Sequence, residues 1–311
     1  MNQACLVDIQ TCQLCGSQEG TEMFQDPPYR VLRCSTCDLV YVTPRHDEDA
    51  LHKLYGEDYW RSNSPKTRGY ACYAEEEPLY LRTFRKRLEL VRHHIPTGKI
   101  RVLDIGCAAG FFLRVMNEEG HEVRGVEVSA DIAALAIEHL GEANIHVGFL
   151  DQLEPQQSGF EIGSFDLITM WDVIEHVPDP QGLLQQAHKL LRPDGTLILE
   201  TQNVDSRFAG ILGKKWQHFK HEEHLYHFNP KTITRLLVDT GYQVVRNTPK
   251  FGGKYVSLGF IAERAGRISK IAGLLCKPLN LLKRLSLYLN LRDEMIVVAR
   301  PGERTSTPKP T

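Results

Sequence analysis

The sequence predicts an α/β fold in which a mostly parallel sheet is covered by helices on both faces. The main observation is an alternation, between Lys99 and Thr201, of short apolar runs with helix-length amphipathic segments. This order is typical of parallel strands joined by crossover helices. The second observation is the length, because 311 residues suffice for one large domain and a small companion.

The elements of this region can be placed from their apolar patterns and their end signals. After the alternating region, Asn229-Pro230 is expected to start a helix that Gly241 ends. We expect strands at 101–106, 122–128, 165–171 and 195–201, helices at 111–120, 129–141 and 180–195, and two last strands at 242–247 and 294–300.

Composition divides the rest of the chain. Residues 254–290 carry seven Lys or Arg against one acid, Glu263, which marks them as a separate, mostly helical insertion before the last strand. The first residues are rich in Cys, Pro and Gly. The expected segments are a cysteine-rich module (1–45), a helical linker or cap (46–98), a ligand-binding domain (99–300, with the insertion at 254–290) and a disordered tail (301–311).

Charge and hydropathy exclude several classes of protein. The N-terminus lacks the basic and apolar regions of a signal peptide, and no stretch reaches the roughly 18 to 20 apolar residues of a membrane span. We therefore expect a cytoplasmic protein whose eight cysteines are reduced. A formal net charge of −2 disfavours general nucleic-acid binding.

A turn of small residues follows the first predicted strand. Asp104 ends that strand, and Gly106, Ala108 and Gly110 lead into a helix whose first N–H groups are free to bind a ligand. The dinucleotide fingerprint G-x-G-x-x-G does not fit this spacing. Glu127 ends the second strand, where it can accept hydrogen bonds from a ribose diol.

The motifs DIGCAAG, GVEVS, FDLITMWDVIEHV and LRPDGTLILET resemble, in this order, the class I S-adenosylmethionine-dependent methyltransferases. The resemblance covers residues 80–250 and the last strand. It implies a Rossmann-like sheet of seven strands, of which the last is antiparallel. It also implies the cofactor contacts: Asp104, Gly106, Ala108 and Gly110 at the methionine end, Glu127 at the ribose, and Leu150, Asp151 and Trp171 around the adenine. A relative that has lost the cofactor and serves as a scaffold is the alternative.

Two C-x-x-C pairs near the N-terminus predict a structural zinc site. Cys12 and Cys15 form the first pair, and Cys34 and Cys37 the second. Four thiolates at this spacing can close a tetrahedral zinc site, and so small a module needs the metal to fold. A dithiol redox pair is the competing interpretation.

The predicted zinc ribbon helps to decide which kind of molecule accepts the methyl group. Some ribosomal-RNA methyltransferases carry such a ribbon, but residues 1–60 hold four Lys or Arg against ten Asp or Glu, which disfavours phosphate binding. The motifs CxxCG and CxxCxLVYVxPR also resemble zinc-ribbon methyltransferases of small-molecule and glycan pathways, including sugar C-methyltransferases. An RNA methyltransferase stays as an alternative.

Two segments compete to supply a catalytic base. His224, preceded by Glu223, resembles the Glu-His element of the sugar C-methyltransferases, in which the histidine is the base. Asp172, Glu175 and His176 resemble the metal site of ubiquinone-biosynthesis O-methyltransferases and could hold Mg²⁺. Because DVIEHV is also found in methyltransferases without a metal, we favour His224 over Mg²⁺ catalysis.

The basic insertion suggests where the acceptor comes from. Leu and Ile at helical spacing with a basic polar face are typical of a helix on a membrane surface, or of a lid with solvated lysines. We therefore expect methyl transfer to a small-molecule, sugar or lipid-linked acceptor, with O-methylation favoured, and peripheral contact with the inner membrane surface through 254–290. The oligomeric state is left open.

Overall fold

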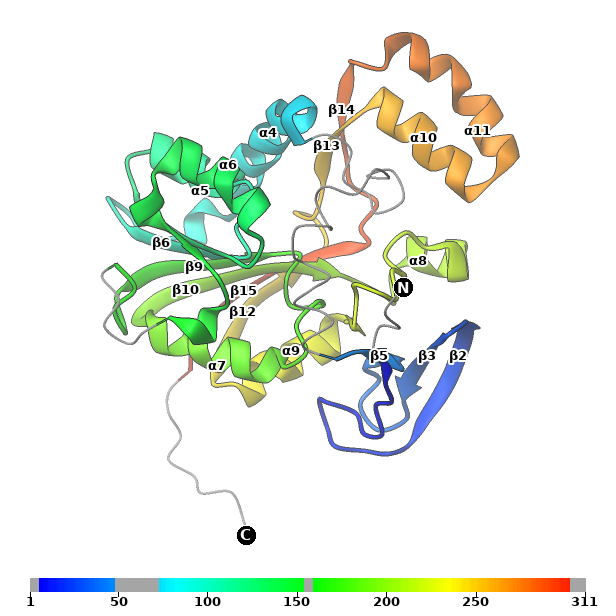
Figure 1. Cartoon of the computed structure of the whole chain (residues 1–311), viewed down its shortest axis with the longest axis horizontal. Helices are drawn as coiled ribbons and strands as arrows, with labels where there is room; N and C mark the ends of the chain where they lie inside the picture. The colour runs from blue at the N-terminus through cyan, green and yellow to red at the C-terminus, as the bar shows by residue number, and fades with distance from the viewer. Residues whose placement is uncertain (1–5, 48–72, 154–158, 303–311) are drawn as a thin grey trace.

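The structure is a computed structural model that describes residues 6–47, 73–153 and 159–302. Its centre is a seven-stranded sheet in the order β12-β15-β10-β9-β6-β7-β8 (Figure 1). Only β15 runs antiparallel to its neighbours, which confirms the predicted sheet and its antiparallel last strand. The strands are β6 (Arg101–Ile105), β7 (Glu122–Glu127), β8 (Ile145–Val147), β9 (Phe165–Trp171), β10 (Leu191–Gln202), β12 (Tyr242–Thr248) and β15 (Glu294–Pro301).

Helices cover both faces of this sheet (Figure 1). One buried cluster joins α4, α5 and α6 to one face, and another joins α7 and α9 to the other. The predicted start of α9 is confirmed, because Asn229 Oδ1 accepts hydrogen bonds from the backbone N–H groups of Lys231 and Thr232. The bounds are α4 (Tyr73–Val91), α5 (Phe111–Glu118), α6 (Ala130–Leu140), α7 (Pro180–Leu190) and α9 (Pro230–Asp239).

Two boundaries differ from the prediction. Helix α7 ends at Leu190 rather than near residue 195, because the chain already pairs with β9 at Leu191 before an irregular stretch that lasts to Thr196. Strand β8 was not among the predicted runs, since its three residues are too short for a visible pattern.

The N-terminal module is a small antiparallel sheet that the α/β domain completes. Its strands are β2 (Gly20–Asp26), β3 (Tyr29–Cys34) and β4 (Val40–Thr43), and β1 (Leu6–Val7) pairs separately with β5 (Arg45–His46). The fourth strand, β11 (Tyr226–His227), comes from the α/β domain and pairs with β4. The module is therefore tied to the segment that contains the predicted base.

The basic insertion is a two-stranded ribbon that carries helices. β13 (Lys254–Ser257) pairs antiparallel with β14 (Ser286–Leu289). Between them lie α10 (Leu258–Ile268), α11 (Lys270–Cys276) and the 3₁₀ helix η5 (Lys277–Leu282). These helices extend away from the central sheet (Figure 1).

The described helices include none that is both long enough and apolar enough to cross a bilayer. Residues 48–72 of the predicted cap and residues 303–311 of the predicted tail lie outside the described residues. The disorder expected of the tail is thus still a prediction.

Candidate active site

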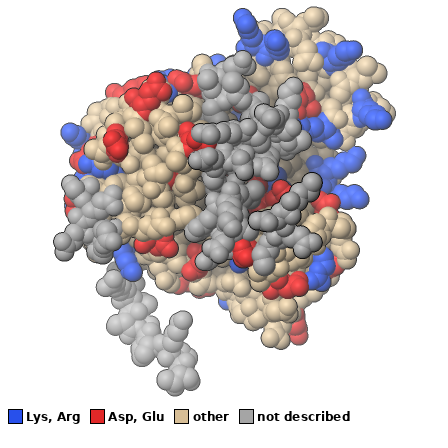
Figure 2. Space-filling model, in the orientation of Figure 1, with Lys and Arg blue, Asp and Glu red and all other residues tan. Residues whose placement is uncertain are grey.

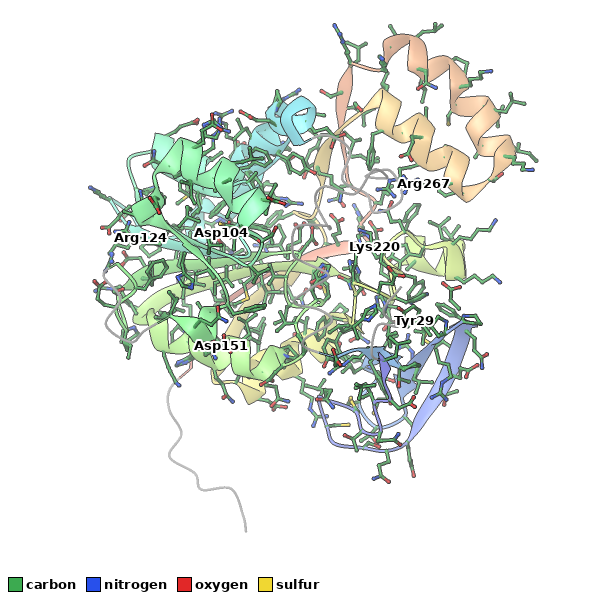
Figure 3. The ribbon with its side chains drawn as sticks, viewed as in Figure 1. Tyr29, Asp104, Arg124, Asp151, Lys220 and Arg267 are labelled. Atoms are coloured by element: carbon green, nitrogen blue, oxygen red, sulfur yellow. The ribbon has the colours of Figure 1, made fainter. Side chains whose placement is uncertain are left out.

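One cavity of about 660 Å³ opens at the carboxyl ends of β6, β7 and β9. This is the edge at which open α/β sheets bind ligands, and the volume suits a small molecule. Figure 3 shows Asp104 near the centre of the sheet, Asp151 below it and Lys220 toward the insertion. The cavity lining includes eight of the predicted site residues: Asp104, Gly106, Ala108, Glu127, Leu150, Asp151, Trp171 and His224.

The turn after β6 has left-handed backbone at all three of its small residues. The φ angles of Gly106, Ala108 and Gly110 are 72°, 47° and 74°. A Cβ on Gly106 would lie 2.5 Å from Val173 Cγ2, so only glycine fits there. Gly110 does not line the cavity; a Cβ there would lie 3.0 Å from Ala136 Cβ, so this glycine lets α5 pack closely on α6.

Two buried carboxyl groups face the cavity from adjacent strands. Asp104 Oδ1 accepts a hydrogen bond from Thr169 Oγ1 at 2.6 Å. Glu127 accepts bonds from the backbone N–H groups of Ala108 and Ser129, both at 2.9 Å. Burial raises the pKa of Asp104 to about 8, with a further contribution from Glu127, and burial also raises the pKa of Glu127. The pair therefore favours a ligand with a positive charge or with hydroxyl donors.

The residues predicted around the adenine lie on two sides of the cavity. Leu150 and Asp151 belong to the 3₁₀ helix η3 (Leu150–Gln152), whereas Trp171 ends β9. The Trp171 ring packs against Phe84 and Phe112, with centroid distances of 5.4 and 5.2 Å. Its indole nitrogen is buried and has no hydrogen-bond partner among the described residues.

The two competing candidates for the base converge at one place. The rings of His176 and His224 are perpendicular, with centroids 4.6 Å apart. The backbone N–H groups of Leu225 and Tyr226 donate to the carbonyl of Glu175, which holds the two segments together. Ligand atoms of Glu175, His176 and His224 all lie within 4.8 Å of one another. The sequence placed these residues in separate sites, and the structure makes one cluster of them.

This cluster differs from the predicted magnesium set. It has two imidazoles and one carboxylate, a nitrogen-rich set that suits Mg²⁺ less well than oxygen ligands would. Asp172 lines the cavity but is not part of the cluster, and its backbone φ is 54°. The carboxyl group lies in the cavity, where partial desolvation, together with the charge of Glu294, raises the pKa of Asp172 to about 6.

Both cluster histidines are neutral at pH 7. Burial lowers the pKa of His224 well below its usual value, and His176 and Lys220 lower it further. Burial likewise lowers the pKa of His176 to about 3. A neutral imidazole on the cavity wall can accept a proton from a bound acceptor.

Glu223 is placed differently from its predicted role beside His224. Its carboxylate lies 3.3 Å from Lys220 Nζ, and its side chain does not line the cavity. Its backbone carbonyl accepts a hydrogen bond from His176. Glu223 thus contacts Lys220 through its carboxylate and His176 through its backbone carbonyl.

Sequence reasoning missed a group of charged residues in and next to the cavity wall, most of them buried. Arg87 of α4 and Glu200 of β10 are 2.6 Å apart, and Lys254 of β13 and Glu294 of β15 are also 2.6 Å apart. His218 lies 3.5 Å from Glu294. The available signal was weak: two acids, Asp293 and Glu294, directly before an apolar strand.

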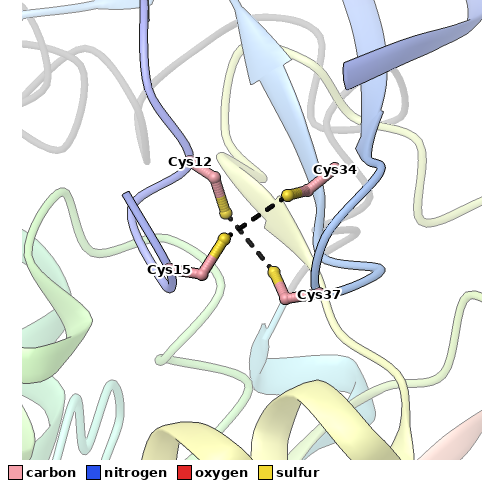
Figure 4. A group of neighbouring side chains, drawn as sticks. All are labelled: Cys12, Cys15, Cys34 and Cys37. Atoms are coloured by element: carbon pink, nitrogen blue, oxygen red, sulfur yellow. Dashed lines mark hydrogen bonds between the residues drawn. The ribbon is translucent and has the colours of Figure 1, made fainter. Parts of the chain in front are cut away.

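The four ribbon cysteines converge on one point, as Figure 4 shows. The Sγ atoms of Cys12 and Cys37 are 3.5 Å apart, as are those of Cys15 and Cys34, and all four lie within 4.8 Å of one another. A zinc ion with bonds of about 2.3 Å to four sulfurs needs sulfur–sulfur distances of roughly 3.8 Å. The donor set and its spacing therefore fit zinc.

Comparisons with known proteins indicate a methyltransferase domain. Residues 73–247 match the methyltransferase domain family. A ubiquinone biosynthesis O-methyltransferase from Xanthomonas campestris is 32% identical over 132 residues, or 42% of this chain and 55% of that protein. One from Psychrobacter arcticus is 26% identical over 224 residues, or 67% and 85%. The chain spans about half the length of most of these curated relatives.

Solved structures share the fold. Magnesium protoporphyrin IX methyltransferase from Synechocystis PCC 6803, solved with bound SAH, has a TM-score of 0.51 and 16% identity, and the match covers 82% of this chain and all of that one. A protein from Pyrococcus horikoshii has a TM-score of 0.50 and 16% identity, covering 79% and 99%. At these identities the comparisons show the fold alone.

Proposed function

Because the chain belongs to the methyltransferase domain family, we propose that it transfers the methyl group of S-adenosylmethionine to a small-molecule or sugar acceptor, with oxygen favoured over carbon as the methylated atom. The observation that carries this proposal is that Asp104, Glu127 and the neutral imidazole of His224 face one cavity. The O-methyltransferase names of the relatives support the choice of oxygen.

The proposed binding mode places the cofactor at the sheet edge. Asp104 and the Gly106–Gly110 turn would hold the methionine end, where the acid matches the positive charge. Glu127 would accept hydrogen bonds from the ribose hydroxyls. Leu150, Asp151 and Trp171 would surround the adenine. Gly110 would contribute indirectly, by allowing α5 to present its N-terminus at the turn.

The chemical step needs an acceptor oxygen in line with the sulfonium methyl group. His224 would take the proton of the acceptor hydroxyl while the oxygen attacks the methyl carbon and the carbon–sulfur bond breaks. Positioning contributes most of the rate, and a base adds about 10²–10⁴-fold. Glu223 would keep His176 oriented through its backbone carbonyl, and Lys220 near the cavity through its carboxylate.

A metal-assisted reaction is the second candidate, favoured by one observation. Glu175, His176 and His224 place three ligand atoms within 4.8 Å, and Glu175 Oε1 and His224 Nδ1 have no hydrogen-bond partner among the described residues. A divalent cation bound there would polarise the acceptor oxygen. His224 takes part in both candidate reactions, so its substitution cannot distinguish them. Removal of divalent cations with a chelator can, because only the metal-assisted reaction needs them.

The N-terminal module, residues 1–45, is proposed to be a ribbon whose four cysteines hold structural zinc, next to a cap at 46–98 and a methyltransferase domain at 99–300. The metal would supply folding energy to a module with a small core. We also propose that the protein is cytoplasmic and contacts the inner membrane surface through residues 254–290.

Label transfer tests the proposed function. Protein carrying zinc is incubated with S-adenosylmethionine labelled at the methyl group and with four acceptor classes: a phenol, a nucleotide sugar, a polyprenyl-linked sugar and bulk RNA. Label in one of the first three supports the proposal, and label in RNA supports the RNA alternative. A folded, zinc-loaded protein that binds no cofactor would instead be a scaffold. Loss of transfer with a chelator and its rescue by Mg²⁺ would favour the metal-assisted reaction.

A further inference from the structure

The outer side of the insertion bears an exposed apolar surface. Six of its side chains on α11, on η5 and just after η5 are between 55% and 88% exposed. Isolated exposed leucines are common, but a group of this size on adjoining helices marks an interaction site. The six are Ile271, Leu274, Leu275, Leu281, Leu282 and Leu285.

Basic side chains surround these apolar ones. Lys270, Lys277, Lys283 and Arg284 are all exposed, and none of them forms an ion pair with a described residue. Glu263, the single acid of residues 254–290, is already paired with Arg267 on α10. Figure 2 shows Lys and Arg side chains gathered along the edge of the molecule that the insertion forms.

We propose that this face, residues 270–287, docks on an anionic lipid bilayer. Its cations match the negative charge of the lipid headgroups, and its leucines can enter the boundary between headgroups and acyl chains. A second copy of the chain fits poorly, because two unpaired basic rims would face each other. An acidic protein partner would match the cations, but this charge match alone would not explain why the leucines are exposed.

The docking face and the cavity share one structural unit. Phe260 and Arg264 of α10 line the cavity, and α11 packs on the other side of α10. The two helices approach closely where Gly266 and Gly273 meet, since a Cβ on Gly273 would lie 2.8 Å from Gly266 Cα. A docked insertion would therefore place the wall of the cavity next to the bilayer. This consequence rests on the proposed function and implies an acceptor that is itself lipid-linked.

Vesicle sedimentation tests the proposal with the full chain loaded with zinc. The protein is mixed with vesicles of phosphatidylcholine containing about one third phosphatidylglycerol, and with vesicles of phosphatidylcholine alone. Two triple variants are compared with the natural chain: Leu274→Ser/Leu275→Ser/Leu281→Ser and Lys277→Gln/Lys283→Gln/Arg284→Gln. The control is Ile162→Ser/Val238→Ser, which removes side chains that are 65% and 56% exposed outside the insertion.

The proposal predicts binding to the anionic vesicles that salt weakens and that each triple variant lowers about tenfold or more, while the control binds as before. Equal binding by the leucine variant and the natural chain would overturn it, as would absence of binding. A dimer in solution that the leucine variant abolishes would assign the face to self-association instead. SAH binding, measured on every variant, reports separately on the proposed function and is expected to be unchanged.

Discussion

Tyr226 and Tyr41 are direct partners across the antiparallel pair of β11 and β4, although 185 positions separate them in the sequence. The Tyr226 hydroxyl accepts a hydrogen bond from Arg45 at 2.7 Å and donates one to the Pro178 carbonyl at 2.9 Å. The cysteine-bearing module thus holds the segment that begins two residues after His224. We infer that the module positions the proposed base.

Loss of the zinc that we propose for the four cysteines is expected to impair methyl transfer without abolishing cofactor binding. Cys34→Ser removes a proposed zinc ligand, so β4 loses support and the segment around His224 loosens. We expect turnover to fall about tenfold or more, while SAH affinity changes little, because Asp104 and Glu127 lie on other elements. Zinc content, turnover and hydrogen exchange of residues 220–228 check this. Cys276→Ser, outside the ribbon, is the control; full turnover by a zinc-free Cys34→Ser would contradict the coupling.

Replacement of the proposed base should lower kcat and leave cofactor binding intact. His224→Gln is expected to reduce kcat by about 10²–10⁴-fold. Burial holds the pKa of His224 well below 6.5, so its imidazole is unprotonated at neutral pH. The kcat of the natural chain should therefore stay constant between pH 8 and 6. His221→Gln, a buried neighbour outside the cavity, is the control. An unchanged kcat in His224→Gln would exclude the assignment.

Cofactor binding should be linked to a proton on Asp104. The folded pKa of about 8 exceeds the usual 3.8, so the empty protein holds a proton there as pH rises from 4 to 8. A cationic ligand favours the ionised carboxylate and must displace this proton. Affinity should therefore rise with pH by up to about tenfold per unit and level off near pH 8. Calorimetry in two buffers of different ionisation enthalpy measures the release. Asp104→Asn should remove this part of the pH dependence. If cofactor affinity rose equally steeply with pH in the natural chain and in Asp104→Asn, the linkage would be refuted.

A glycine at position 108 should stabilise the empty protein. Ala108 has a φ of 47°, a left-handed conformation that costs a residue with a Cβ roughly 1–2 kcal/mol. Ala108→Gly removes this strain but adds freedom to the unfolded chain, so the expected gain is up to about 1 kcal/mol. Ala109→Gly, at a buried position without positive φ, should destabilise. Urea unfolding compares the two, and a loss of stability in Ala108→Gly would show that its strain is compensated.

Local signals were enough to predict the sheet and to bring Asp104 and Glu127 to one edge of it. Asp104 and Glu127 end apolar runs of adjacent parallel strands, so the pattern that predicts the strands also brings these two acids to one edge. The fold was predictable from the alternation of strands and helices, whereas the family was predicted from the resemblance of four motifs to known methyltransferases. Gly110 shows the limit of such motifs, because the sequence does not tell a glycine that approaches a ligand from one that allows helix packing.

The side of the cavity that we propose for the acceptor could not be predicted, because contacts between residues far apart in the sequence build it. His224 lies against His176 at the point where β11 pairs with β4 and the backbone N–H groups of Leu225 and Tyr226 donate to the Glu175 carbonyl. Likewise, Arg87 and Glu200 come from a helix and a strand 113 positions apart. Neither pairing follows from the periodicity of a single segment.

Titration of the purified, zinc-loaded chain with S-adenosylmethionine and SAH tests the central claim most directly. The proposed function predicts micromolar binding at one site per chain. Glu127→Gln, which removes the proposed ribose contact, should weaken it about tenfold or more. Glu122→Gln, at the other end of the same strand and outside the cavity, should leave it unchanged. No binding to the folded natural chain would contradict the claim that this cavity serves methyl transfer.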